Sequence, residues 1–218
     1  MPRRAATEGI GSGPAPMLRS QHAEATRRAV LAAARSLFGR QGYAQTSVDE
    51  IADAARVTKG AVYHHFAGKE ALFRAVLAEV EAEAEARAVR AVDPATRPID
   101  QIVARVHAYL DAALDQEMRR IVLIDAPAVL GLEPEGSVDQ QPGHVDLRSF
   151  IAASAARGQL VDLDPDLLTH LIRGLVWLSG LHIAHASDPG MTRAALGEAL
   201  DVMLRGLAPG PQPPARGL

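Results

Sequence analysis

Residues 46–77 read TSVDEIADAARVTKGAVYHHFAGKEALFRAVL, and their pattern is the most informative about the fold. Its apolar residues recur at helical spacing, and breaks at Arg56-Val57 and Gly68 divide it into three segments. We predict short helices over residues 47–55 and 58–64, with a longer helix after Gly68. Two short helices joined by a tight turn are typical of a helix-turn-helix.

Capping residues fix where these helices begin. Ser47-x-x-Glu50 is a capping box, which satisfies two backbone donors at the start of the first short helix. Thr58 is the N-cap candidate of the second, and Lys69 begins the third. A supporting helix over residues 20–40 completes a three-helix reading head.

The second short helix offers chemistry suited to DNA. Its start carries Thr58, Lys59 and Gly60, where a hydroxyl, an ammonium and free backbone N–H groups favour phosphate. Tyr63 and His64 lie one turn further on, where either could reach a phosphate or a base edge. Tyr63 could equally be a core residue, and short helix pairs also occur in bundles that bind no DNA.

The charge distribution also favours a polyanion-binding surface near the N-terminal end of the chain. The chain has a net charge of −3, yet residues 1–70 hold 10 Lys and Arg against 6 Asp and Glu, whereas residues 71–218 are net negative. Affinity for polyanions therefore resides at the basic end. Lys69 begins a helix, where a cation is unfavourable, and a bound anion would relieve that conflict.

The remainder of the chain also has a helical period. We expect an arm without regular structure over 1–19, a reading head over 20–68, a helical domain over 69–207 and a tail over 208–218. Within the helical domain, we predict a helix over 99–116 and a buried helix in the stretch MRRIVLIDAPAVLG, broken near Pro127 and Gly131. A mobile loop over 132–143 and helices over 144–157, 165–186 and 191–207 follow.

Residues 46–77, and more broadly 24–77, resemble the TetR/AcrR family of transcriptional repressors. The resemblance implies an all-α homodimer of about nine helices, with an N-terminal three-helix helix-turn-helix domain and a C-terminal ligand-binding and dimerisation domain. It implies a repressor that binds a palindromic operator and is released by a small, hydrophobic molecule. The DNA-binding residues that it implies are Thr46, Ser47, Thr58, Lys59, Gly60, Tyr63, His64 and Lys69.

Polar residues on otherwise apolar helices are candidates for the ligand pocket. They are His107, Tyr109, Arg119, Arg120, Asp125, His144, Arg173, Trp177 and His182. Each has a structural alternative, such as a hydrogen-bonded core histidine, an Asp–Arg pair or a packed indole. Leucines repeat at helical spacing over 167–176 and 196–207; the resemblance places these helices in the dimer interface, although one protomer could bury them by itself.

Several function classes find no support in the residues. The absence of cysteine excludes disulfides and thiolate metal sites, and we find no catalytic constellation, metal-ligand set or cofactor motif. The glutamates at 79, 81, 83 and 85 are interpreted as a solvated run. Lacking an export signal or a membrane-length apolar run, the chain is expected to be cytoplasmic and away from membranes. One rival hypothesis is a helical small-molecule carrier or enzyme with a vestigial reading head. Another is a DNA-binding protein that activates transcription or has a purely architectural role.

Overall fold

The computed structural model describes residues 15–131 and 142–209, and these residues contain helices and connecting turns without a strand. The all-α fold class is thereby confirmed. The helices are α1 (Ala15–Gln41), α2 (Val48–Ala55), α3 (Lys59–His65), α4 (Lys69–Arg90), α5 (Pro98–Ala112), α6 (Gln116–Met118), η1 (Arg119–Asp125), α7 (Ala126–Leu130), α8 (Pro142–Ala156), α9 (Pro165–His185) and α10 (Pro189–Arg205).

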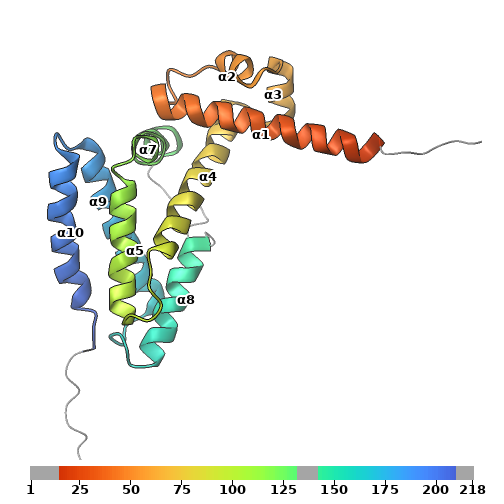
Figure 1. Ribbon diagram of the computed structural model, residues 1–218. Helices are drawn as coiled ribbons and strands as arrows, with labels where there is room; N and C mark the ends of the chain where they lie inside the picture. The colour runs from red at the N-terminus through yellow and green to blue at the C-terminus, as the bar shows by residue number, and fades with distance from the viewer. Residues whose placement is uncertain (1–14, 132–141, 210–218) are drawn as a thin grey trace, which may run out of the picture.

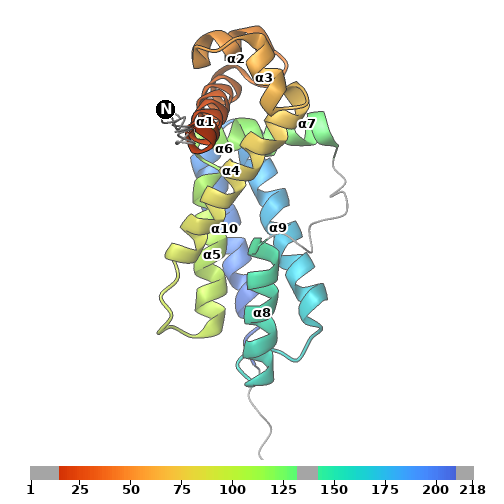
Figure 2. The same cartoon turned by 90° about the vertical axis from the view of Figure 1, so that its right-hand side faces the viewer.

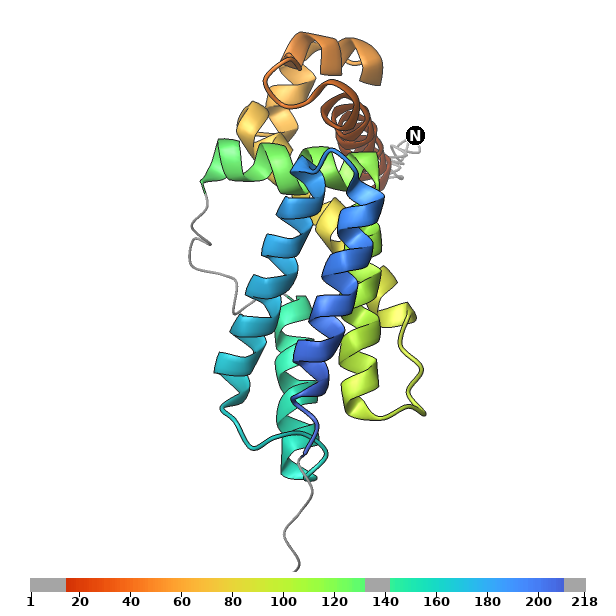
Figure 3. The ribbon, with the colours of Figure 1, turned by 90° about the vertical axis from the view of Figure 1, so that its left-hand side faces the viewer.

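The helices form a head and a bundle connected by α4. In Figure 1, α2 and α3 lie against α1 at one end of the molecule, and α4 runs from this head down into the bundle. Helices α5, α8, α9 and α10 make up the bundle with the lower part of α4 (Figure 2). The segment α6–η1–α7 crosses between the head and the upper ends of α9 and α10 (Figure 3). Any signal that passes from bundle to head must therefore pass along α4 or through this crossing layer.

Three aromatic rings hold the head on α4. Phe38 of α1 and Phe73 of α4 are fully buried, with ring centroids 5.3 Å apart in an edge-on arrangement. Tyr43, from the turn after α1, lies 5.0 Å from Phe73 and 5.8 Å from Phe38. Such edge-on aromatic contacts add to the stabilisation from burial. Helix α1, its following turn and α4 consequently form one packed unit.

Several predicted helix boundaries differ from the structure; α5 ends at Ala112 rather than residue 116, and α10 begins at Pro189 rather than residue 191. Helix α1 begins at Ala15, five residues inside the stretch assigned to the arm, and α8 begins at Pro142 rather than residue 144. Proline is compatible with the first turn of a helix because its missing N–H has no partner there. The remainder of the arm, the predicted mobile loop from residue 132 to 141 and the tail from residue 210 lie outside the described residues.

The predicted break near Pro127 is instead a change of helix type. Residues Arg119–Asp125 form a π-helix, and the N–H of Ala126 donates to the carbonyl of Ile121, five residues back. Proline cannot donate a hydrogen bond, and its ring clashes with the carbonyl four residues earlier in an α-helix. A wider turn immediately before Pro127 accommodates this conflict, so the chain continues as helix to Leu130.

Among the described residues, helix α9 is long and apolar enough to cross a membrane by length and composition alone, although Arg173 interrupts its apolar run. In the structure it packs beside α5, α8, α10 and η1. Its apolar residues divide between two faces: Leu168 and Ile172 are buried, whereas Leu167, Leu171 and Leu178 are more than half exposed.

Candidate functional site

The head presents α2 and α3 through the caps that the sequence predicts. The hydroxyl of Ser47 accepts from the Glu50 N–H at 3.1 Å, and the Glu50 carboxylate accepts from the Ser47 N–H at 2.8 Å. Thr58 caps α3 by accepting from the N–H of Ala61. Val62 is buried beneath α3, which orients the opposite face of that short helix outward. Both helices of the predicted helix-turn-helix are thus confirmed.

The outward face of α3 is open. Tyr63 is 50% exposed, and His64 is exposed beside it, with its ring edge-on to that of His65. Tyr63 is therefore no core residue in this structure. A Cβ at Gly60 would meet only the Thr58 hydroxyl, at 3.9 Å, so the start of α3 is unobstructed. A groove wall could approach this backbone closely.

Both lysines of the candidate surface have partners within the protein. Lys59 forms an exposed 2.9 Å ion pair with Asp49 of α2, and this hydrogen bond raises the pKa of the lysine. The Lys69 ammonium lies 4.1 Å from the centre of the Tyr43 ring, and partial burial lowers its pKa. A phosphate would have to displace Asp49 to bind Lys59, whereas Lys69 is held in place by a ring.

Thr46 does not fit the role that the resemblance implies. It is only 2% exposed, and its hydroxyl donates to the Gly42 carbonyl at 2.8 Å. The side chain therefore closes the turn after α1 and is withdrawn from any surface that DNA could touch. Ser47, the next residue, is exposed at the N-terminus of α2 and is the better placed of the two.

A cavity of about 540 Å³ lies in the bundle between α4, α5, η1 and α9. Most of its lining is apolar, and α4 contributes a row of alanines. Trp177, Arg173 and Tyr109 line it, in agreement with the candidates for a ligand pocket. Cavities of this size, apolar with a few polar groups, are typical of small-molecule sites.

Glu81 lines this cavity, which corrects its interpretation as part of a solvated run. Burial raises the pKa of its carboxyl, and the nearby Arg173 opposes that shift without cancelling it. The cavity-lining residues of α4 include Ala78, Glu81, Ala82 and Glu85, a helical i, i+3, i+4, i+7 pattern. This helical spacing could have been recognised in the sequence as a buried face of α4. The alternating glutamates of the same stretch favoured a solvent-exposed interpretation instead.

Two further polar side chains line the cavity. Burial raises the pKa of Tyr109 further above its ordinary value of 10.0, and its phenol, neutral at pH 7 in either case, can donate a hydrogen bond. Arg105, which the sequence interpretation missed, bonds to Asp146 at 2.6 Å and lies over the Phe150 ring. The guanidinium of Arg105 therefore already has partners on α8.

The remaining pocket candidates lie elsewhere. His107 bonds to Asp201 at 2.6 Å and to Arg193 at 2.9 Å, which joins α5 to α10. His182 is exposed on α9, and Arg119 is outside the cavity lining. The side chain of His144 lies outside the described residues. His107 thus fits the structural alternative of a hydrogen-bonded histidine, whereas His182 is neither in the core nor in the cavity lining.

Arg120 and Asp125 lie at the junction of η1 with the head. Asp125 is buried, and its carboxylate accepts from the Tyr43 N–H at 2.7 Å. The guanidinium of Arg120, 3.4 Å from that carboxylate, fills the space beside Gly42. A Cβ at Gly42 would come within 2.0 Å of Arg120, and Gly42 also has a φ of +83°. The turn after α1 is therefore fitted closely to η1.

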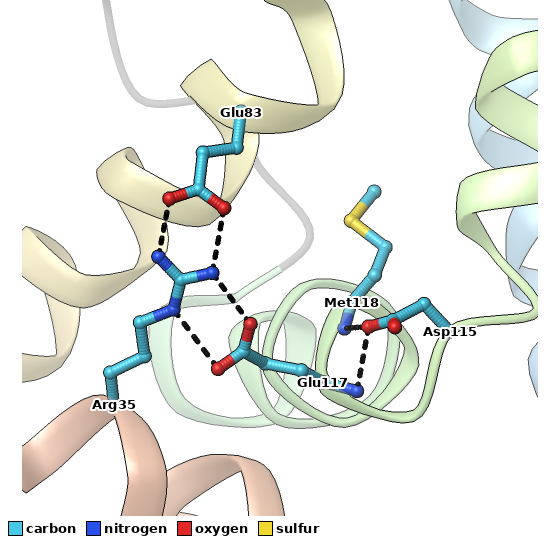
Figure 4. A network of polar contacts seen from close by, with 5 residues as sticks. All are labelled: Arg35, Glu83, Asp115, Glu117 and Met118. Carbon is cyan, nitrogen blue, oxygen red and sulfur yellow. Dashed lines mark hydrogen bonds and ion pairs between the residues drawn. The ribbon is translucent and has the colours of Figure 1, made fainter. Parts of the chain in front are cut away.

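A second connection joins three helices, as Figure 4 shows. Arg35 of α1 donates to both carboxylate oxygens of Glu83 on α4, at 2.6 and 2.7 Å. The same guanidinium donates to Glu117 of α6 at 2.6 and 3.0 Å. Such bidentate Arg–carboxylate pairs fix the relative orientation of the two side chains as well as the distance between them. The head is thereby bonded to both α4 and α6.

Comparisons with known proteins give the same division of the chain. Residues 30–76 match the family described as bacterial regulatory proteins, tetR family, and residues 99–207 match the tetracyclin repressor-like C-terminal domain. A crystal structure of a TetR-family transcriptional regulator from Pectobacterium atrosepticum is 37% identical, with a TM-score of 0.77 over 88% of this chain and 98% of that chain.

Two curated relatives extend beyond the head. The HTH-type transcriptional repressor KstR2 of Mycolicibacterium smegmatis is 29% identical over 70% of this chain and 77% of its own length. The transposon Tn10 TetC protein of Escherichia coli is 27% identical over 76% of this chain and 82% of its own length. The matches cover head and bundle alike. The chain therefore belongs to the TetR family of ligand-responsive, DNA-binding transcriptional repressors.

Proposed function

We propose that α3 enters the major groove of an operator, with Tyr63 and His64 against the groove and Ser47, Thr58, Lys59, Gly60 and Lys69 toward the phosphates. The observation that carries this proposal is the open face of α3, with Tyr63 half exposed above a buried Val62. A vestigial head would have no need of an exposed tyrosine in that position.

The test uses duplexes that the protein selects from a randomised DNA library. Lys59→Ala and Tyr63→Ala are each expected to weaken binding to the selected duplex by at least tenfold. Arg90→Ala, at the far end of α4, removes an exposed arginine as a control and should leave affinity unchanged. Failure of the wild-type protein to select any sequence would refute the proposal.

We also propose that the cavity holds the effector, a mostly apolar molecule with a polar group that bonds to Glu81, Tyr109 or Arg173. Trp177 is the single tryptophan of the chain and lines the cavity, so its emission reports occupancy directly. A panel of steroids, fatty acids and aromatic acids would be titrated while Trp177 emission and DNA anisotropy are followed together.

The cavity assignment has its own control. Ala82→Phe fills space in the lining at a position that is exposed toward the mouth, so the fold should tolerate it. This variant should bind DNA as the wild type does but should lose both the emission change and the release of DNA. A compound that releases DNA equally from both proteins would act at another site.

Release of DNA requires the ligand to bind one arrangement of the head more tightly than another. We propose that η1 and α6 transmit this preference. Met118 and Val122 line the cavity, whereas Glu117 and Asp125 of the same segment bond to the head. A ligand that pushes this segment outward through Met118 and Val122 would move Glu117 and Asp125 with it, because all four residues lie on one short helical stretch.

We propose further that two copies pair through α9 and α10. The exposed apolar residues on these helices are Leu167, Leu171, Leu178, Met191, Val202 and Met203. A second copy of this chain covers such a face best, because a palindromic operator needs two recognition helices about 34–36 Å apart. On this proposal the protein acts in the cytoplasm as a regulator and not as an enzyme.

A further inference from the structure

The turn between α2 and α3 contains a residue in an unfavourable conformation. Arg56 has φ 57° and ψ 42°, and it alone among the described non-glycine residues has a positive φ. Its N–H closes α2 by donating to the carbonyls of Ala52 and Asp53. This left-handed C-cap conformation is most favourable for glycine, because any Cβ crowds the following carbonyl. The backbone therefore gives no reason for an arginine at this position.

Side-chain packing does not explain the arginine at position 56 either. Arg56 is exposed, and no hydrogen bond or ion pair joins its guanidinium to any residue that the structure describes. The two lysines near α3 differ in this respect: Lys59 is bound to Asp49, and Lys69 lies over the Tyr43 ring. Of these three cations, Arg56 is the one that could take up a phosphate without giving up a partner.

Its position suits that task. Arg56 lies two residues before Thr58, the cap of α3, and three before Lys59, on the turn that brings α3 to the surface. A side chain as long as arginine reaches beyond the helix start, and its planar fork binds phosphate oxygens in pairs. Residues kept in strained backbone regions are often kept for a functional contact.

We propose that Arg56 binds a phosphate of the operator backbone beside the groove that receives α3. The contact rests on the proposed mode of DNA binding and adds a residue to it. It supplies affinity without sequence preference, because every nucleotide carries the same phosphate. The strained turn thus gains a contact with DNA that glycine could not provide.

The experiment compares three substitutions at one position, using the duplex that the wild-type protein selects from randomised DNA. Arg56→Gly removes the charge and the strain, Arg56→Gln removes the charge alone, and Arg56→Lys keeps the charge. Arg90→Gln serves as the matched control, since Arg90 is an exposed arginine far from the head.

We expect Arg56→Gly and Arg56→Gln to weaken binding to the same degree, on the order of tens-fold per dimer at 0.1 M salt. The slope of log affinity against log salt should become shallower by about 0.9 per protomer, or about 1.8 per dimer. Arg56→Lys should retain most of the slope. Thermal melting should show Arg56→Gly at or above the wild type and above Arg56→Gln.

The outcomes separate this inference from the proposed function. A wild-type protein that selects no duplex would refute the mode of DNA binding itself. A selected duplex that Arg56→Gly binds with unchanged affinity and slope would overturn the role of Arg56 alone. A loss confined to some operator sequences would also overturn it, because a phosphate contact weakens all sequences alike.

Discussion

Glu117 and Met118 are neighbours in the chain, yet they face opposite ways. The Glu117 carboxylate bonds to Arg35 of the head, and the Met118 side chain points away from this contact (Figure 4). Met118 is buried and lines the cavity. Asp115 caps both residues by accepting from their N–H groups at 3.0 and 3.1 Å. A single turn of helix thus connects the candidate effector site to the DNA-binding domain.

Glu117→Gln should destabilise the protein by about 1 kcal/mol or more, because Arg35 loses one of its two carboxylate partners in a partly buried setting. Urea unfolding at pH 7 measures the change. The control is Glu70→Gln, which breaks an exposed i,i+4 pair with Arg74 and should cost only about 0.3–0.5 kcal/mol. Equal losses in the two variants would mean that the Arg35 connection adds no more than a surface pair.

Gly42→Ala should destabilise more than Gly158→Ala. Both glycines have a left-handed φ, +83° and +67°, so alanine strains each backbone by roughly 1–2 kcal/mol. Only at Gly42 does the new Cβ also collide with Arg120; at Gly158 nothing lies within 4 Å. Thermal unfolding of both variants checks the order. Arg120→Ala combined with Gly42→Ala should recover part of the loss, and strictly additive effects would contradict the contact.

Glu81→Gln should stabilise the protein at pH 7 but not at pH 4. Burial raises the pKa of this carboxyl above its ordinary 4.5. Its stability contribution is therefore complete below 4.5 and is lost as the pH rises through the folded value. Glutamine stays neutral throughout, so its advantage appears only at the higher pH. Melting temperatures of wild type and variant at both values test this, with exposed Glu79→Gln as control; a gain of equal size at both pH values would disprove it.

Leu178→Glu should convert a dimer into a monomer. Leu178 is 58% exposed on α9, and burying a charge in an apolar interface carries a large desolvation cost. Analytical ultracentrifugation gives the mass, and affinity for a palindromic duplex should fall in parallel. Val89→Glu, at an exposed apolar position on α4, is the matched control and should leave the mass unchanged. A dimeric Leu178→Glu protein would place the interface elsewhere.

Local patterns predicted the head well because its determinants are close in sequence. The Ser47–Glu50 capping box and the Thr58 cap each join residues three apart, so spacing alone fixes them. The π-helix before Pro127 could not be predicted from local spacing in this way. A proline marks a conflict in a helix, but whether the chain breaks or widens depends on what packs around it.

Residue types and their spacing were enough to predict the short helices of the head and their caps, because those features depend on neighbours within about one turn. The exposure of Tyr63, the place of Glu81 at a cavity, the burial of Thr46 and the position of Arg120 beside Gly42 follow instead from how the helices pack. The contact between Asp125 and Tyr43 spans 82 residues. Such contacts arise when whole helices pack together, and no local pattern of residue types encodes which side chains will meet.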